Sequence, residues 1–190
     1  MTQELKNLKQ GLKKLFWLTY GLTLKNPVLP ENPVSFLFVC KGNICRSPFA
    51  ERLAEKMVNN KSYGSMTFVS AGIQAPESSG PPENAVLSAE RFGVRLGDHK
   101  ARQLDAAFIN SADMVLVMEP WHLKTLIKNF PDAREKIFLL SLFDKDDAKE
   151  KDVFIRYNIA DPYGRPPEQF DLCYRRIEKC LMGLFSSVKN

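Results

Sequence analysis

The sequence predicts an α/β fold in which helices cover both faces of a four-stranded parallel sheet, with an amphipathic helix ahead of it. After residue 33, short apolar segments alternate with segments whose apolar residues recur at helical spacing. Such alternation is typical of a parallel sheet, because each return to the same edge requires a crossover that is usually a helix. The 190 residues are 44% hydrophobic, which is enough for one substantial core.

The expected strands are short apolar runs at residues 35–39, 67–70, 114–118 and 137–140. The expected helices span residues 48–59, 83–92, 120–129 and 167–188. Pro48 suits the first turn of a helix, and Gly93 suits the position after the last turn. An apolar stripe runs along the last helix through Phe170, Tyr174, Ile177, Leu181 and Phe185. The charged residues 144–152 are expected to form a surface loop.

The first 34 residues are expected to be an extension to a domain that spans residues 35–190. Prolines mark the linker at Pro27, Pro30 and Pro33. An apolar stripe within residues 1–20 comprises Leu5, Leu8, Leu12, Leu15 and Phe16. Lysines lie on its flank and opposite face, at Lys6, Lys9, Lys13 and Lys14, with Trp17 and Tyr20 near the polar boundary. Such a helix must bury its stripe. Two ways to bury it remain open. The stripe packs against the chain's own domain or a second copy of the chain, or it makes peripheral contact with an anionic membrane surface.

The composition argues against several classes of protein. The net charge of +5 is not gathered into a dense basic stripe, so we expect no nucleic-acid partner. No signal-peptide pattern and no apolar run of about 18 residues is present. We therefore expect a cytoplasmic protein with free thiols. Cys173 and Cys180, seven residues apart on the last expected helix, are interpreted as packing residues. His122 is expected on a helix surface, without a function.

The segment from Cys40 to Pro48 lies at the junction of the first expected strand and its helix, where ligands of parallel sheets bind. Its loop consists of Lys41, Gly42, Asn43, Ile44, Cys45 and Arg46. A tight loop at this junction turns its backbone N–H groups inward, and the helix dipole adds to the anion cradle that they form. Gly42 and Asn43 tolerate the backbone geometry that such a loop needs. Arg46 can hold two phosphate oxygens, and the same positive field favours the thiolate of Cys40. The segment predicts a phosphate site with an activated nucleophile.

This segment resembles the signature of the low-molecular-weight protein-tyrosine phosphatase family. Further matches follow in order: Ser70-Ala71-Gly72, His99-Lys100-Ala101-Arg102-Gln103 and Asp161-Pro162-Tyr163-Gly164. The similarity extends over residues 35–188. It implies the fold of that family, tyrosine-phosphorylated proteins as substrates, and hydrolysis through a phosphocysteine intermediate.

The resemblance also implies a role for each catalytic residue. Cys40 is the nucleophile, Arg46 the phosphate clamp, and Ser47 a hydrogen-bond donor that assists departure of the thiolate. Asp161 is the general acid and then the general base. A general acid is chemically required, because a phenolate leaving group needs a proton in the transition state. No cofactor or metal is expected, since the loop amides and Arg46 neutralise the transferring group.

Other residues support the site by the same resemblance. Asn43, held by His99 and Ser70, keeps the loop in its binding shape, and Cys45 is a thiol that can form a protective disulfide with Cys40. Tyr163 forms one wall of the substrate cleft. The opposite wall usually carries a large aromatic residue, but residues 74–77 here read Gln-Ala-Pro-Glu. Lys41 adds a positive charge inside the cradle.

Three alternatives remain beside the tyrosine phosphatase. Arsenate reductases on this fold use further cysteines, and the sequence has none from residue 57 to residue 170. Protein-arginine phosphatases carry a threonine at the position of Ile44, whose shape favours a phenyl ester. A non-catalytic phosphate-binding module would be expected to lack Cys40 or Asp161, and both are present.

Overall fold

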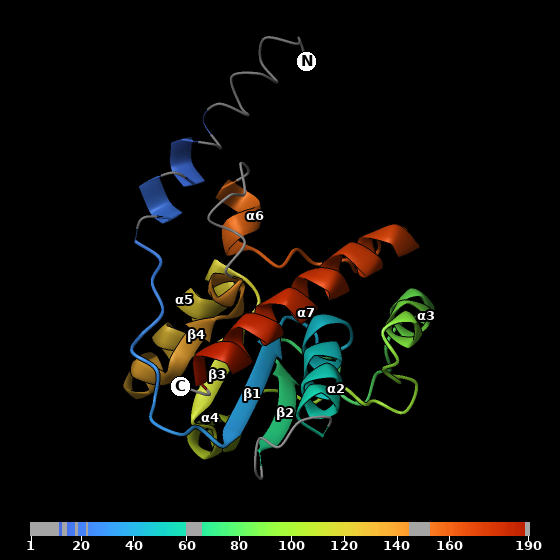
Figure 1. Cartoon of the computed structure of the whole chain (residues 1–190), viewed down its shortest axis with the longest axis horizontal. Helices are drawn as coiled ribbons and strands as arrows, with labels where there is room; N and C mark the ends of the chain where they lie inside the picture. The colour runs from blue at the N-terminus through green and yellow to red at the C-terminus, as the bar shows by residue number, and fades with distance from the viewer. Residues whose placement is uncertain are drawn as a thin grey trace.

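The computed structural model describes residues 12, 15–17, 19–21, 23–59, 66–144 and 153–188. Its centre is a sheet of four parallel strands, β1 (Ser35–Cys40), β2 (Thr67–Gly72), β3 (Met114–Val117) and β4 (Ile137–Leu139). The strand order is β2-β1-β3-β4, so β1 and β3 are the central strands (Figure 1). The predicted four-stranded parallel sheet is confirmed.

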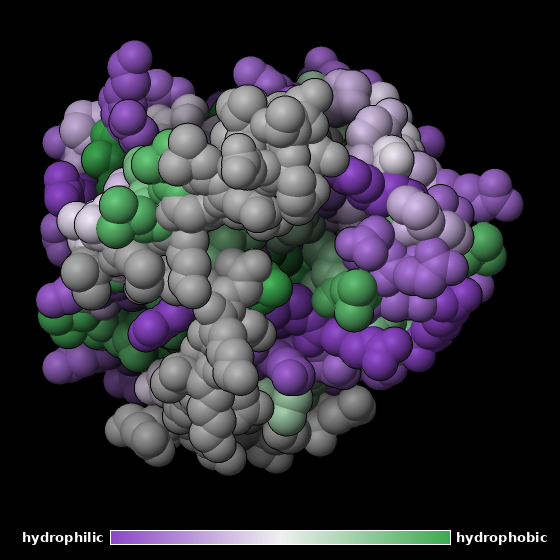
Figure 2. All heavy atoms as spheres, turned by 90° about the horizontal axis from the view of Figure 1, so that it is seen from above, coloured by the Kyte–Doolittle hydropathy of each residue, from purple (hydrophilic) through white to green (hydrophobic). Residues whose placement is uncertain are grey.

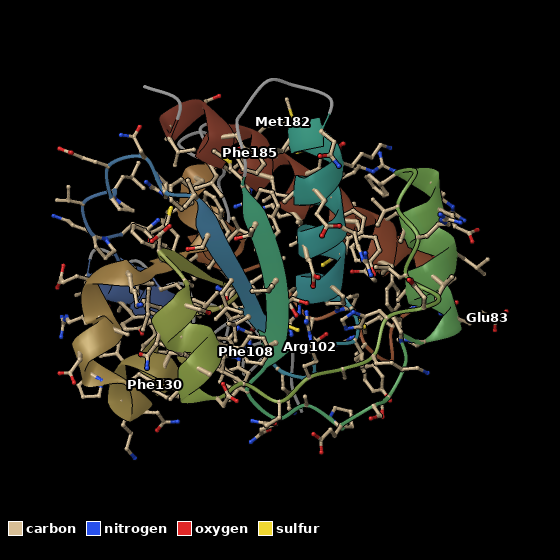
Figure 3. All side chains as sticks on the ribbon, turned by 90° about the horizontal axis from the view of Figure 1, so that it is seen from below. Glu83, Arg102, Phe108, Phe130, Met182 and Phe185 are labelled. Carbon is tan, nitrogen blue, oxygen red and sulfur yellow. The ribbon has the colours of Figure 1, made fainter. Side chains whose placement is uncertain are left out.

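Three helices cover one face of this sheet: α2 (Arg46–Asn59), α3 (Glu83–Arg91) and α7 (Pro167–Val188). The long helix α7 crosses in front of the sheet in Figure 1. Near its end, the ring centroid of Phe185 lies 6.3 Å from that of Phe36 on β1 and 5.9 Å from that of Phe68 on β2 (Figure 3). All five residues of the predicted stripe on this helix are buried, which is the packing that their spacing indicates.

The opposite face is covered by α4 (Ala106–Ser111) and α5 (Pro120–Asn129), with the 3-10 helices η1 (Pro131–Lys136) and η2 (Leu140–Phe143) and the short α6 (Val153–Tyr157) nearby. The sequence did not predict α4 or α6, because helices of five or six residues are too short to establish an apolar period. The start of α4 is held by Asp105, whose side chain accepts the N–H of Phe108 at 3.0 Å. Of the charged loop expected at residues 144–152, residues 145–152 lie outside the described part of the chain.

The carboxyl ends of β1 and β2 approach each other unusually closely. Cys40 pairs with Gly72 at the last position of both strands. A Cβ on Gly72 would lie 2.9 Å from the backbone N of Asn43 and from the carbonyl oxygen of Lys41. Only glycine therefore allows β2 to end against the loop that follows β1.

The N-terminal residues contact the rest of the chain through side chains other than those of the expected stripe. Residues 15–17 and 19–21 are helical, and Trp17 and Tyr20 pack against the core on the α4–α5 face. By contrast, Leu12, Leu15 and Phe16 are 55–59% exposed. Leu5, Leu8 and the four lysines lie outside the described residues. Nowhere in the described ranges is a helix long and apolar enough to cross a bilayer.

Candidate active site

The loop after β1 curls around the sulfur of Cys40. Asn43 has a φ of 52°, in the left-handed region that asparagine tolerates, and its backbone N–H points to the Cys40 Sγ at 3.2 Å. The Oγ of Ser47, in the first turn of α2, lies 3.1 Å from the same sulfur. The N–H of Asn43 and the hydroxyl group of Ser47 thus converge on Cys40, and both are able to donate to a thiolate.

The side chain of Asn43 ties this loop to its surroundings. Its Nδ2 donates to the Oγ of Ser47 at 2.9 Å and to the Oγ of Ser70 at 2.8 Å. Its Oδ1 accepts the backbone N–H of Arg102 at 2.9 Å. The Nε2 of His99 donates to the carbonyl oxygen of Asn43 at 2.8 Å, and burial lowers the pKa of this histidine. The structure thus brings Asn43, His99 and Ser70 together, as the resemblance implied.

Glu51 extends this network and was not singled out from the sequence. It follows Ser47 by one helical turn, is buried, and accepts a hydrogen bond from the Oγ of Ser70. Burial raises the pKa of Glu51, although Arg102 lies 3.3 Å away and opposes the shift. The guanidinium of Arg102 is in turn 5.6 Å from the ring centroid of Phe108 (Figure 3). A carboxylate on an amphipathic helix is usually on the exposed face, so periodicity provided no signal for Glu51.

Arg46 is a buried guanidinium held between two carboxylates. Its Nη2 lies 2.7 Å from the Oδ2 of Asp161, and its Nη1 donates to Glu119 and, at 2.9 Å, to the carbonyl oxygen of Ile159. Burial lowers the pKa of Arg46, but the negative charges at Cys40, Asp161 and Glu119 outweigh it and raise the pKa. Its Nε has no hydrogen-bond partner among the described residues. The edge formed by Nε and Nη2 is therefore free to receive an oxyanion in exchange for Asp161.

Glu119 and His122 form a pair behind Arg46 that the sequence analysis missed. Glu119 lies two residues beyond β3, and its backbone N–H donates to the Nδ1 of His122 at 3.2 Å. The expectation that His122 lies on a helix surface is wrong, because the side chain is fully buried in the first turn of α5. Burial, with the charge of Arg46, lowers its pKa to about 2. The sequence offered no signal for this pair, because Glu and His at this spacing are not the Ser/Thr and Glu/Gln pattern of a capping box.

A cavity of about 250 Å³ opens onto Cys40 at this end of the sheet. Its lining comprises Cys40, Lys41, Gly42, Ile44, Cys45, Arg46, Gln74, Pro76, Asp161 and Tyr163. Figure 2 looks onto this end of the molecule, and the coloured part of this face carries both hydrophilic and hydrophobic side chains. Tyr163 is 61% exposed at the rim, and the side that carries Gln74 and Pro76 has no aromatic residue.

The remaining thiols are buried. Burial raises the pKa of Cys45 above its usual range and that of Cys173 to about 12. All four cysteines are buried, and Cys173 and Cys180 face the core from α7. These two act as packing residues in the fold, as their position on the last helix predicted.

A thiol at the base of an amide-lined cradle, beside a buried arginine and a carboxylate, defines a cysteine-dependent phosphomonoester hydrolase. The sequence profile described as "Low molecular weight phosphotyrosine protein phosphatase" matches residues 35–190. The chain belongs to this family and is an enzyme of the protein-tyrosine phosphatase type.

Individual relatives match this chain over most of its length, and solved structures share its fold. The low molecular weight protein-tyrosine-phosphatase Wzb of Salmonella typhi is 32% identical over 143 residues, which cover 75% of this chain and 86% of Wzb. The crystal structure of the Erwinia amylovora tyrosine phosphatase AmsI superimposes with a TM-score of 0.72 at 30% identity, covering 83% of this chain and 95% of AmsI. A protein-arginine-phosphatase of Geobacillus stearothermophilus is 34% identical over 138 residues, which cover 73% of this chain and 84% of that protein.

Proposed function

We propose that this enzyme hydrolyses phosphotyrosine in proteins through a phosphocysteine intermediate formed on Cys40. The observation that carries the proposal is the arrangement of Arg46, whose Nε lacks a partner among the described residues and whose Nη2 holds only the exchangeable Asp161. A phosphate that binds this edge displaces the Asp161 carboxylate, which is then close to the ester oxygen.

In the first step, the loop amides and Arg46 bind the phosphoryl oxygens. The thiolate of Cys40 attacks phosphorus, the bond from phosphorus to the phenolic oxygen breaks, and Asp161 gives its proton to that oxygen. Asp161 lies at the rim, with its Oδ1 3.2 Å from the backbone N of Tyr163, which keeps the carboxyl group beside the aromatic wall.

In the second step, Asp161 takes a proton from a water molecule, and the water attacks the phosphocysteine. The sulfur–phosphorus bond breaks, inorganic phosphate forms, and the sulfur leaves as a thiolate stabilised by Ser47 and the N–H of Asn43. Asn43, held by Ser70 and His99, acts as a positioning residue for the loop.

The preference for phosphotyrosine rests on the walls of the cavity. Ile44 lines it with an apolar branched side chain, and Tyr163 offers a ring on which a phenyl ester can stack. A phosphoarginine would bring a charged guanidinium next to Lys41 and Ile44, without an acidic partner in the cavity lining other than Asp161. Phosphoarginine remains the second candidate, because the relative from Geobacillus stearothermophilus bears that activity in its name.

A turnover panel of phosphotyrosine, phosphoserine and phosphoarginine peptides, with arsenate as a further substrate, tests this function. We expect phosphotyrosine to have the highest kcat/KM, and rapid acid quench to trap phosphate on Cys40. Cys40→Ser should bind phosphate without turnover. Near-normal activity of Cys40→Ser would refute the mechanism, whereas a higher kcat/KM for phosphoarginine would refute only the substrate.

The role of Asp161 needs a separate measurement. Asp161→Asn should lower kcat/KM for aryl phosphates with poor leaving groups by roughly 100-fold, and for acidic leaving groups much less. An equal loss across a series of aryl phosphates would show that Asp161 is not the general acid.

We further propose that the enzyme is cytoplasmic and contacts anionic membrane surfaces through residues 1–20. The support is the exposure of Leu12, Leu15 and Phe16, together with the four lysines that the sequence places in this segment. The full chain should co-sediment with anionic vesicles and dissociate at high salt, unlike neutral vesicles or a chain that begins at Pro33. Failure of the full chain to bind at low salt would exclude the membrane, and a concentration-dependent dimer lost on shortening would favour self-association.

A further inference from the structure

The N-terminal segment is seated on α6, and the contact is close. The rings of Trp17 and Phe154 meet edge to face, with their centroids 5.2 Å apart. One turn further along, a Cβ on Gly21 would lie 2.2 Å from the Cε2 of Tyr157, so the backbone at Gly21 lies directly on that ring. Tyr157 itself is buried. Figure 1 shows the blue helical turns of this segment beside α6.

The same segment is anchored a second time, on the edge strand of the sheet. The side chain of Asn26 donates to the carbonyl oxygen of Leu139 at 3.2 Å and accepts the N–H of Leu139 at 2.7 Å. Asn26 thus satisfies both backbone groups at the end of β4. This second anchor limits the range of positions from which Trp17 and Gly21 can reach α6.

The helix α6 depends on such contacts for its position. Five residues are far too few for a helix to be stable by itself, so packing decides where it lies. On the α7 side, Arg176 is 3.4 Å from the carbonyl oxygens of Ile155 and Arg156. On the other side, the N-terminal segment covers Phe154 and Tyr157.

The end of α6 leads directly to the catalytic loop. Asn158 closes the helix, with its N–H donating to Ile155 at 3.2 Å and its Nδ2 donating to the carbonyl oxygen of Phe154 at 2.7 Å. The carbonyl oxygen of Ile159 then accepts a hydrogen bond from the Nη1 of Arg46, and Asp161 forms an ion pair with the same guanidinium. Only residues 158–160 separate Tyr157 from Asp161. A displacement of α6 therefore reaches the carboxyl group through a very short piece of chain.

We propose that docking of the N-terminal segment on α6 keeps the backbone of the loop that carries Asp161 beside the phosphate site, and that Trp17 is a positioning residue for proton transfer to the leaving group. This inference rests on the proposed role of Asp161 as general acid. This docking contact is additional to the part of the chain that matches the family, because Trp17 and Gly21 lie outside residues 35–190. The backbone N–H of Ile159 also donates to the carbonyl oxygen of Met118 at 2.9 Å, which holds this loop next to the end of β3. We therefore expect loss of the docking to misplace Asp161 without releasing the loop from the sheet.

Three variants of the full chain test the proposal. Trp17→Ala removes the ring that contacts Phe154, and Gly21→Ala forces the backbone away from Tyr157. Leu15→Ala is the matched control, since Leu15 is 58% exposed and lies on the same helical segment. The measurement is kcat/KM for aryl phosphates of graded leaving-group pKa, because this parameter reports the step in which the phenol departs.

Trp17→Ala and Gly21→Ala should lower kcat/KM by about fivefold for poor leaving groups, since a misplaced acid loses part of its contribution. For acidic leaving groups the loss should be below about twofold, because they need little protonation. Leu15→Ala should match the native enzyme, and Trp17→Phe, which restores an aromatic contact, should recover most of the loss. Thermal unfolding of each variant confirms that the compared proteins are folded.

The outcomes separate this inference from the function on which it rests. If Asp161→Asn steepens the leaving-group dependence and neither Trp17→Ala nor Gly21→Ala does, the docking does not position the acid, and the proposed function stands. Equal losses across the series in Trp17→Ala would also overturn the inference, since they indicate a general disturbance of the site. If Asp161→Asn itself leaves the dependence unchanged, the assignment of the general acid fails first.

Discussion

Acidification should destabilise this protein through His122. The side chain is fully buried behind Arg46, and its pKa in the folded protein is about 2, compared with an ordinary value of 6.5. Between these two values the unfolded chain binds a proton that the folded protein does not. The free energy of unfolding must therefore fall as the pH falls below 6.5.

The size of the effect follows from the width of this interval. Each pH unit below 6.5 costs at most about 1.4 kcal/mol, so from pH 7.5 to pH 5 the loss through His122 is about 2 kcal/mol. The comparison is with His122→Asn, because the Oδ1 of asparagine can accept the N–H of Glu119 as Nδ1 does now and does not titrate. His99, the other histidine of the chain, is present in both proteins and cancels from the difference.

Urea unfolding at pH 7.5, 6 and 5, at constant ionic strength, measures both proteins. The stability of the native protein relative to His122→Asn should decrease by about 2 kcal/mol across this range. A difference that stays constant would refute the reasoning. It would mean that His122 is protonated in the folded state, for which Glu119, 4.0 Å from Nε2, is the available partner.

Three further predictions concern the site itself. Glu119→Gln should lower kcat/KM by about tenfold, because a neutral amide holds Arg46 less strongly than a carboxylate; an unchanged value would show that Asp161 alone positions the guanidinium. Pro76→Trp should lower KM for small aryl phosphates by about fivefold by adding the missing aromatic wall, and an unchanged or higher KM would show that residue 76 does not contact the substrate. Under mild peroxide, peptide mapping should find a reversible disulfide between Cys40 and Cys45; equal rates of overoxidation in Cys45→Ala and the native protein would contradict this.

The elements of the fold were predictable where the sequence pattern was long. The helix expected at residues 120–129 and the helix expected at residues 167–188 have the bounds seen in the structure. The helix α2 was expected to begin at Pro48 but begins at Arg46. The reason is that the N–H groups of the first helical turn need no intrahelical partner, so a proline fits there without ending the helix. Residues 106–111 and 153–157 carried no periodic signal of sufficient length.

The residues of the site were likewise predictable where they lie close together in the sequence. Cys40, Arg46 and the loop between them were identified because they are contiguous and lie at a strand–helix junction. Glu119 was missed because it reaches the site from the junction of β3 and α5, away from the loop. Glu51 was missed because a carboxylate on an amphipathic helix is expected on the exposed face. Each is one of 22 acidic residues in the chain. His122 was assigned to a surface, since a histidine in an amphipathic helix carries no mark of burial by itself.

The sequence by itself determined the class of fold, the nucleophile with its phosphate-binding loop, and the acid before the last helix, because these depend on local spacing and on the order of strands and helices. Only the tertiary structure decided what surrounds them. It placed Glu119 and Asp161 on Arg46, buried His122 behind them, and seated Trp17 on α6 while the adjacent stripe stayed exposed. These contacts join residues far apart in the chain, and their free energy depends on packing and burial, which residue order alone does not specify.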